Sequence, residues 1–192
     1  MIDRTPLAPL LALTALALAA CATEAPAAED RLAAPAASQP VGALRPYVEP
    51  VTRLRFPVLA EGVTVEAEHH DPSLPAKKFR HTIHLRTASG PAVIINVWHN
   101  PSALPLRAWF DAHLAFLVGP STRVSERPMA RARVPGILLR EPRSPQALSQ
   151  AVGVFASGDQ VFRVTCLDEE GNADNRRIFE RVIEDLETGV TP

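Results

Sequence analysis

The six histidines of this chain are candidate ligands for a metal ion. The densest group is His69, His70 and Asp71, which follows a segment of strand-like character. Neighbouring residues of a strand point to opposite faces of a sheet, so His69 and His70 would not share one metal ion. His81 and His84 also fall on opposite faces of their strand. Neither Cys-x-x-Cys nor His-x-x-x-His spacing occurs, so we predict no metal site and no cofactor.

A cysteine near the C-terminus and the acidic loop after it are the next candidates. Cys166 alternates with apolar strand residues, so we expect it to point inward, where apolar surroundings raise the pKa of a thiol and make it inert. Residues 168–174 are spaced like calcium ligands, but Ala173 and Phe179 stand where an EF-hand needs Gly and Glu. A looser cation site stays an alternative there. Because Gly-x-Ser-x-Gly, a P-loop and a dinucleotide motif are also absent, the sequence predicts no enzyme.

Arginines gather between residues 123 and 140, and at strand spacing four of them would share one face. Such a face would offer a docking surface to an acidic partner or a lipid head group, and the alternative is an ordinary exposed sheet face. The formal net charge of −1 excludes a broad electrostatic footprint for nucleic acid. The four residues of this predicted docking surface are Arg123, Arg127, Arg131 and Arg133.

The other cysteine, Cys21, ends an N-terminal apolar stretch. Residues 7–20 are mostly Leu and Ala, and the stretch is shorter than the roughly 20 residues that a spanning helix needs. It closes with Leu18-Ala19-Ala20-Cys21, which resembles the lipobox of bacterial lipoproteins. The resemblance implies recognition of Leu18, Ala19 and Ala20 by a signal peptidase, cleavage before Cys21, and lipid on its thiol. The alternative is a secretory signal with an incidental cysteine.

The lipobox resemblance determines where we expect the protein to act and how we divide the chain into domains. Two or three acyl chains on one cysteine would hold the protein at a membrane, whereas a single chain binds only marginally. Ala22, in place of Asp, fits transfer to the outer membrane in Gram-negative lipoproteins, so we expect an envelope protein on the outer membrane, facing the periplasm. We divide the chain into a signal peptide (1–20), a lipidated, Ala/Pro-rich flexible linker (21–45) and a globular domain (46–192).

Two amphipathic helices and several strands must build that domain. Apolar residues recur at helical spacing over residues 105–118 and 173–187, with Asn172 or Asp174 as a cap for the second helix. Two turns, at Ala88-Ser89-Gly90 and Ser157-Gly158-Asp159, join alternating segments. We therefore predict an α+β fold with an antiparallel sheet of about six or seven strands, and two main helices that cover its one buried face. The expected strands are 51–56, 63–68, 78–86, 93–98, 136–141, 148–156 and 160–167.

The order and apolar pattern of these elements, over residues 50–187, are similar to those of the PsbP/Mog1-like fold. The resemblance implies a non-enzymatic accessory or assembly factor, as members of that family are, several of them bacterial lipoproteins. We therefore expect a membrane-anchored, non-catalytic binding or accessory module, held by membrane lipid through Cys21 and acting on a protein partner in the envelope. The alternatives are a small envelope hydrolase and a small-ligand carrier. The segments that carry the likeness are Leu104-Pro105-Leu106-Arg107-Ala108-Trp109, Val161-Phe162-Arg163-Val164, Ile178-Phe179 and Val182-Ile183.

Overall fold

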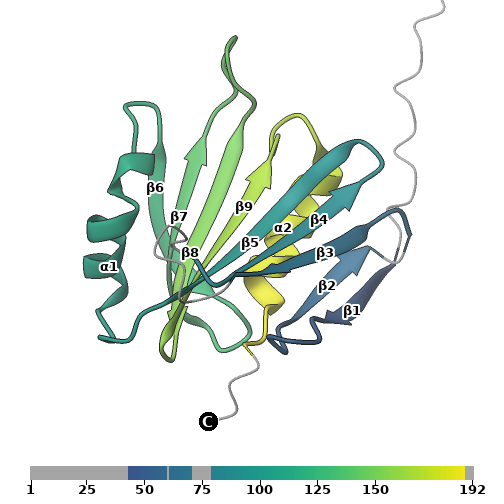
Figure 1. Cartoon of the computed structure of the whole chain (residues 1–192). Coiled ribbons are helices and arrows are strands. Elements are labelled where there is room, and N and C mark those ends of the chain that lie inside the picture. Colours follow the sequence, from purple (N-terminus) through teal and green to yellow (C-terminus); the bar gives the residue numbers. More distant parts are fainter. Residues whose placement is uncertain (1–42, 60, 71–78, 189–192) are drawn as a thin grey trace, which may run out of the picture. The chain divides into compact units, whose positions relative to one another are not determined.

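The computed structural model of this chain describes residues 43–59, 61–70 and 79–188. These residues form an α+β domain, which confirms the predicted class. Figure 1 shows its elements in chain order: β1 (Leu44–Val48), β2 (Arg55–Leu59), β3 (Thr64–His69), β4 (His81–Thr87), β5 (Gly90–His99), α1 (Leu106–His113), the short 3₁₀ helix η1 (Ala115–Leu117), β6 (Arg123–Met129), β7 (Val134–Glu141), β8 (Gln150–Ser157), β9 (Gln160–Leu167) and α2 (Ala173–Asp185).

Seven of the described strands form one antiparallel sheet in the order β3-β4-β5-β9-β8-β7-β6. Strands β1 and β2 pair separately. The two turns predicted from the sequence join β4 to β5 and β8 to β9, and Gly90 and Gly158 adopt positive φ values of 118° and 60° there. The central strand of the sheet is β9, and its neighbour β5 lies far from it along the chain.

Both faces of this sheet are buried over part of their area. On one face, α2 and residues of β2 pack against Ile95, Phe162 and their neighbours. On the other face, Trp109 and Phe110 of α1 pack against a separate apolar cluster that includes Val154. We call these the α2 face and the α1 face. The expectation that both helices cover one buried face is wrong, because β7 and β8 are apolar on both sides and each side needs a cover.

The C-terminal helix follows the sequence prediction closely. The Asn172 side chain accepts hydrogen bonds from the backbone N–H groups of Asp174 and Asn175, both at 3.1 Å, which is a typical N-cap. The predicted helix at 105–118 is shorter than expected: α1 ends at His113 and continues as η1. Among the described residues, no helix has both the length and the apolar character needed to cross a bilayer.

The N-terminal part and one edge differ most from expectation. The domain already begins its first strand at Leu44, before the boundary placed at residue 46. The strand expected at 51–56 is wrong, because Glu49 accepts hydrogen bonds from the backbone of Val51 and Thr52 and holds a turn there. Strand β6 is not among the seven strands expected from the sequence, although strand spacing was considered for its arginines. It lacks alternation and contains Pro128, which an edge strand tolerates.

Candidate binding site

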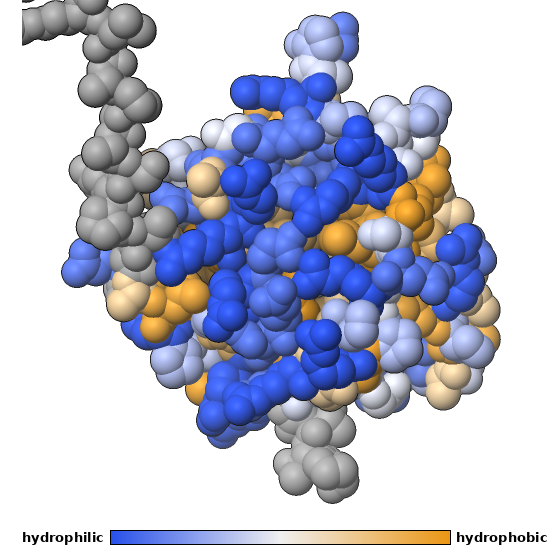
Figure 2. All heavy atoms as spheres, turned by 180° about the vertical axis from the view of Figure 1, so that it is seen from behind, coloured by the Kyte–Doolittle hydropathy of each residue, from blue (hydrophilic) through white to orange (hydrophobic). Residues whose placement is uncertain are grey.

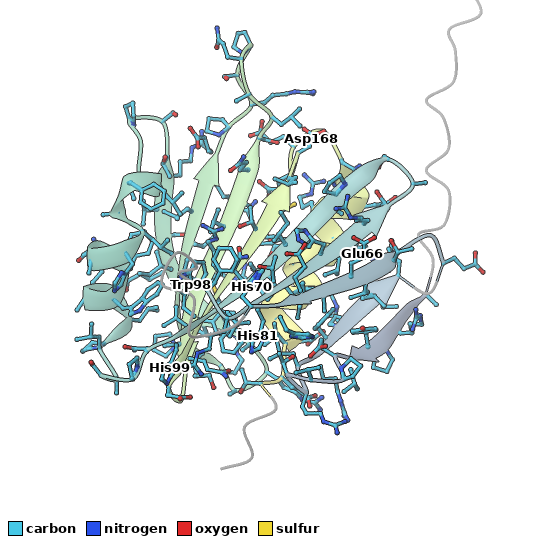
Figure 3. All side chains as sticks on the ribbon, viewed as in Figure 1. Glu66, His70, His81, Trp98, His99 and Asp168 are labelled. Atoms are coloured by element: carbon cyan, nitrogen blue, oxygen red, sulfur yellow. The ribbon has the colours of Figure 1, made fainter. Side chains whose placement is uncertain are left out.

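Helix α1 covers only part of the α1 face, over β7, β8 and the adjoining end of β5. Toward β3 and β4, the same face carries polar side chains instead. Figure 3 shows His70 and Trp98 on this side of the sheet. We call this group the polar patch and define it by His70, Thr82, Asn96, Trp98 and Arg163.

The register of three strands builds a row of side chains across the polar patch. Thr82 of β4 lies opposite Asn96 of β5, which lies opposite Arg163 of β9. Directly opposed side chains on one face are close enough to interact. Asn96 Nδ2 donates to Thr82 Oγ1 at 3.1 Å, and Arg163 Nη2 donates to Asn96 Oδ1 at 2.8 Å. His70 Nε2 extends the row, 3.4 Å from Thr82 Oγ1.

Arg163 is the unusual member of this row. Its guanidinium lies over the Trp98 ring, 5.1 Å from the ring centroid, and its Nε is buried without a hydrogen-bond partner. It forms no ion pair with any other residue in the described ranges. Burial lowers the pKa of this guanidinium below its ordinary value. Arg163 is half-buried, and a charge taken partly out of water in this way is stabilised by an anionic partner.

Aromatic rings form an apolar wall beside Arg163. Phe79 makes edge contacts with the rings of His70 and Trp98, at centroid distances of 5.2 and 5.6 Å. Trp98 in turn meets Trp109 of α1 at 5.7 Å. Such edge-to-face ring pairs add stability beyond their buried area and hold the rings in place. The polar patch therefore combines one cation, an amide and a rigid aromatic wall.

The histidines separate as the sequence predicted. His70 contacts Thr82 on the α1 face, whereas His69 lies with His81 and Glu49 near the second, two-stranded sheet. Within the described ranges, no three His, Cys, Asp or Glu side chains converge as metal ligands.

The group formed by Glu49, His69 and His81 is a buried acid next to two imidazoles. Glu49 is 1% exposed, and its Oε1 lies 3.4 Å from His69 Nε2. His69 Nδ1 lies 3.0 Å from His81 Nδ1, a contact that needs one shared proton. Burial alone would raise the pKa of Glu49, but hydrogen bonds from Thr52 and Val51, together with His69, lower it.

This group predicts a loss of stability in mild acid. Burial and the neighbouring His69 lower the pKa of His81 and outweigh Glu49, while Arg80 and His70 act in the same direction as His69. The unfolded chain therefore binds a proton at His81 more readily, and the free energy of unfolding falls as the pH drops below 6.5. Urea unfolding at several pH values measures how the free energy of unfolding depends on pH. Just below pH 6.5, this dependence should be weaker in His81→Gln than in the wild type. An unchanged dependence would contradict the assignment.

Cys166 is buried, as predicted from its strand position. Burial raises the pKa of its thiol to about 12, an effect that the nearby Arg140 only partly offsets. Only the thiolate reacts as a nucleophile, so the group is inert at neutral pH.

Labelling with a thiol reagent tests this burial. In a Cys21→Ser chain, Cys166 is the remaining cysteine. We expect almost no modification at pH 8 in the folded protein and complete modification in 6 M guanidinium chloride, because unfolding returns the thiol to water. Rapid labelling without denaturant would show that Cys166 is accessible.

The acidic loop after β9 does not gather its oxygens in one place. Glu169 forms an ion pair with Arg140, whereas Glu170 accepts a hydrogen bond from the backbone N–H of Arg143 at 3.0 Å. Asn172 caps α2. Of the side chains that resembled calcium ligands in the sequence, Glu170 and Asn172 thus serve separate structural contacts, whereas Asp168 Oδ1 is buried without a hydrogen-bond partner in the described part of the chain.

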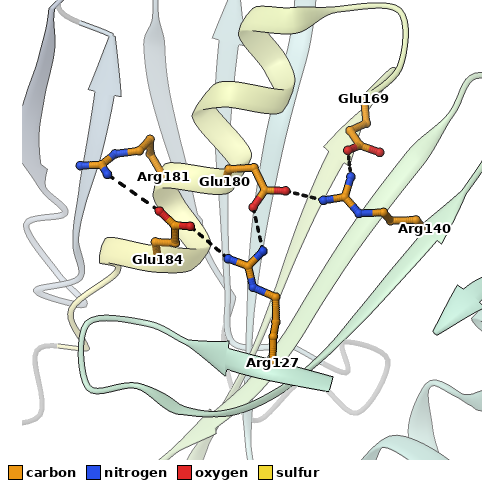
Figure 4. Close-up of polar contacts among 6 residues, drawn as sticks. All are labelled: Arg127, Arg140, Glu169, Glu180, Arg181 and Glu184. Atoms are coloured by element: carbon orange, nitrogen blue, oxygen red, sulfur yellow. Dashed lines mark hydrogen bonds and ion pairs between the residues drawn. The ribbon is translucent and has the colours of Figure 1, made fainter. Parts of the chain in front are cut away.

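Arg127, one of the four residues of the predicted arginine docking surface, is engaged with α2. Figure 4 shows a chain of alternating charges in which Arg127 contacts Glu180 and Glu184, both at 3.1 Å, and Arg140 contacts Glu180 and Glu169. We call this chain of contacts the charge clasp. It joins β6, β7 and the loop after β9 to α2. Its arginines therefore already have acidic partners.

The remaining members of that surface are scattered. Arg131 pairs with Glu187, and β6 ends at Met129, so Arg131 and Arg133 lie in a turn and not on the expected strand face. Arg123 and Arg133 are exposed and form no ion pair with another described residue. Viewed from the α2 side, the surface is mainly hydrophilic (Figure 2). Docking through Arg123, Arg127, Arg131 and Arg133 stays a prediction.

Two adjoining hollows lie where α2 ends, with volumes of about 560 and 620 Å³. Both are lined by Arg55, Arg131 and Glu187, which pair with one another. Their charged lining is unlike the apolar cavity that a carrier of small apolar ligands needs.

No family model matches this chain, and neither does any curated protein. Among solved structures, cyanobacterial PsbP (CyanoP) from Synechocystis sp. PCC 6803 is similar to it, with a TM-score of 0.42 and 8% sequence identity. The match covers 81% of this chain and 98% of that chain. The resemblance found in the sequence is to the same family.

Proposed function

We propose that this chain is a lipid-anchored protein of the bacterial envelope whose domain is a non-catalytic binding module. The polar patch carries the proposal. Its guanidinium, at Arg163, is held on a rigid sheet by Asn96 and Trp98 and has no acidic partner among the described residues. A cation kept in place in this way is ready to receive a ligand without reorganisation.

The proposed anchor is lipid on Cys21, after cleavage behind Leu18, Ala19 and Ala20. These residues lie outside the described ranges, so the support is their sequence pattern alone. Ala22 favours the outer membrane, facing the periplasm. Fatty-acid labelling of cells that make the wild-type chain or Cys21→Ser tests this anchor, and equal labelling of the two chains would refute it.

The proposed partner is a protein of the envelope that meets the polar patch. A photoreactive amino acid at Ile94, a half-buried residue beside the patch on β5, should crosslink to such a partner in intact cells. The same amino acid at Asp174, an exposed residue at the start of α2, is the control. We expect a discrete adduct from position 94 alone. Adducts of equal yield from both positions, or from neither, would argue against the proposal.

A hydrolase is the rival function, because Thr82 lies within reach of His70. Thr82 is only 5% exposed, however, and its hydroxyl already accepts a hydrogen bond from Asn96. A nucleophile must reach its substrate, so this arrangement favours a structural role for Thr82 over a catalytic one. Hydrolysis of ester substrates by the purified chain, abolished in Thr82→Val, would establish the rival instead.

A further inference from the structure

We infer that the polar patch binds a carboxylate group: Arg163 holds the carboxylate, and the wall of Phe79 and Trp98 receives an apolar group next to it. This inference rests on the proposed binding function and adds the chemical class of the ligand.

The unused hydrogen-bonding capacity of Arg163 is the first support. A guanidinium has five N–H donors, and in the described structure one hydrogen bond, from Nη2 to Asn96, is formed. Nη1 has no hydrogen-bond partner in the described ranges, and Nε is buried without one. A buried donor without an acceptor costs free energy that a bound oxyanion would recover. The planar fork of arginine suits a carboxylate in particular.

The charges around Arg163 decide between a carboxylate and a phosphate. Arg86 is already paired with Glu66, with 3.0 Å between Nε and Oε2. Glu68 lies 3.8 Å from both His70 and His84, so a carboxylate already faces these imidazoles. Among Arg86, His70, His84 and Arg163, Arg163 is thus the one that lacks an anion among the described residues. A single positive charge matches a carboxylate of charge −1 better than a phosphate of about −2.

The rings define the other half of the ligand. Trp98 is 8% exposed, and Phe79 lies beside it with its ring partly accessible. An aliphatic or aromatic group next to the carboxylate would cover these ring edges and bury apolar area. Acetate, which lacks such a group, should therefore bind less tightly than phenylacetate.

Titration of the purified full chain with phenylacetate, acetate and inorganic phosphate at constant ionic strength tests the inference. Tryptophan fluorescence and the side-chain Nε–H signal of Arg163 in NMR report on the site. We expect saturable binding in the order phenylacetate, acetate, phosphate. Arg163→Met should weaken phenylacetate binding about tenfold or more, because it removes the charge-assisted hydrogen bonds. Arg143→Met, which removes an exposed arginine from the loop between β7 and β8, should change it less than about twofold.

Asn96→Asp is the sharper variant. It retains the side-chain shape and places a carboxylate 2.8 Å from Arg163 Nη2, so an internal anion should occupy the guanidinium and abolish phenylacetate binding. Near-UV circular dichroism confirms the fold, and Arg163→Lys replaces Arg163→Met if the latter unfolds, with intermediate binding expected.

Three results would overturn the inference: no saturable phenylacetate binding to the wild type, equal binding by Asn96→Asp, or tighter binding of phosphate than of carboxylate. The crosslinking experiment separates this failure from that of the proposed function. An adduct at position 94 without carboxylate binding would leave a binding module whose ligand class is different. Carboxylate binding without any adduct would instead support the anion-binding site and argue against the proposed protein partner.

Discussion

Replacement of Arg140 by methionine is expected to lower the free energy of unfolding by about 2–3 kcal/mol. Arg140 contacts both Glu169 and Glu180, and the Glu169 side chain is only 6% exposed. Without the guanidinium, Glu169 would stay buried beside an apolar side chain and would have to lose its charge or turn outward. Because Arg140 itself is 35% exposed, water reaches part of the site, and the loss should stay below that of a fully buried pair. Urea unfolding measures it directly.

Arg123 provides a matched control for this prediction. It lies directly opposite Arg140 in the β6–β7 pair but forms no ion pair with another described residue. Arg123→Met should therefore change stability by less than about 0.5 kcal/mol. In the double variant Arg140→Met/Glu169→Gln, part of the loss should return, because the uncompensated charge is gone. Equal losses in the two arginine variants would mean that the charge clasp does not stabilise the domain.

Truncation of Trp109 to alanine is expected to cost about 3–5 kcal/mol, the largest loss we predict. Trp109 is 3% exposed and joins α1 to Trp98 on the sheet. The helix spans only Leu106–His113, and a helix of this length does not persist without tertiary packing. Its loss would uncover the apolar side of β7 and β8. We therefore expect faster hydrogen exchange throughout α1 in addition to the lower unfolding free energy.

Phe116 is the control for the aromatic truncation. It follows α1 in the chain but is 77% exposed, so Phe116→Ala should change stability by less than about 0.5 kcal/mol. If Trp109→Ala changes the free energy of unfolding as little as Phe116→Ala does, Trp109 does not hold α1 in place. The separate core on the α1 face would then contribute little to the stability of the domain.

The sequence predicted the parts of the fold whose apolar period is strong. The helix over 173–185 and the hairpin of β8 and β9 have regular spacing, a cap or a turn residue, and an apolar side that packs locally. Strand β6 has none of these, since it is a sheet edge held by Arg127 through residues of a distant helix. The placement of α1 and α2 on opposite faces follows from β7 and β8 being apolar on both sides, which a period of two does not reveal.

The candidate site was not predicted from the sequence, although one signal was present. Arg163 is the one charged residue of β9, a largely buried strand in which a charge needs a special reason. Its neighbours Asn96 and Thr82 come from two other strands, and only the sheet register reveals that the three lie in one row. The arginines at 123–133 looked like a docking surface because the glutamates opposite them are about 50 residues further along the chain.

The pairing of β5 with β9 also bears on when this protein folds. Strand β9 is the central strand of the sheet, so the sheet has no centre until residue 167 has been synthesised. Pairing between such distant segments is slow, because the loop must close before any contact forms. At a synthesis rate of about 5–20 residues per second, β5, which ends at His99, is made several seconds before β9 is complete at Leu167. During this interval, β3, β4 and β5 lack the neighbour that joins them to the rest of the sheet.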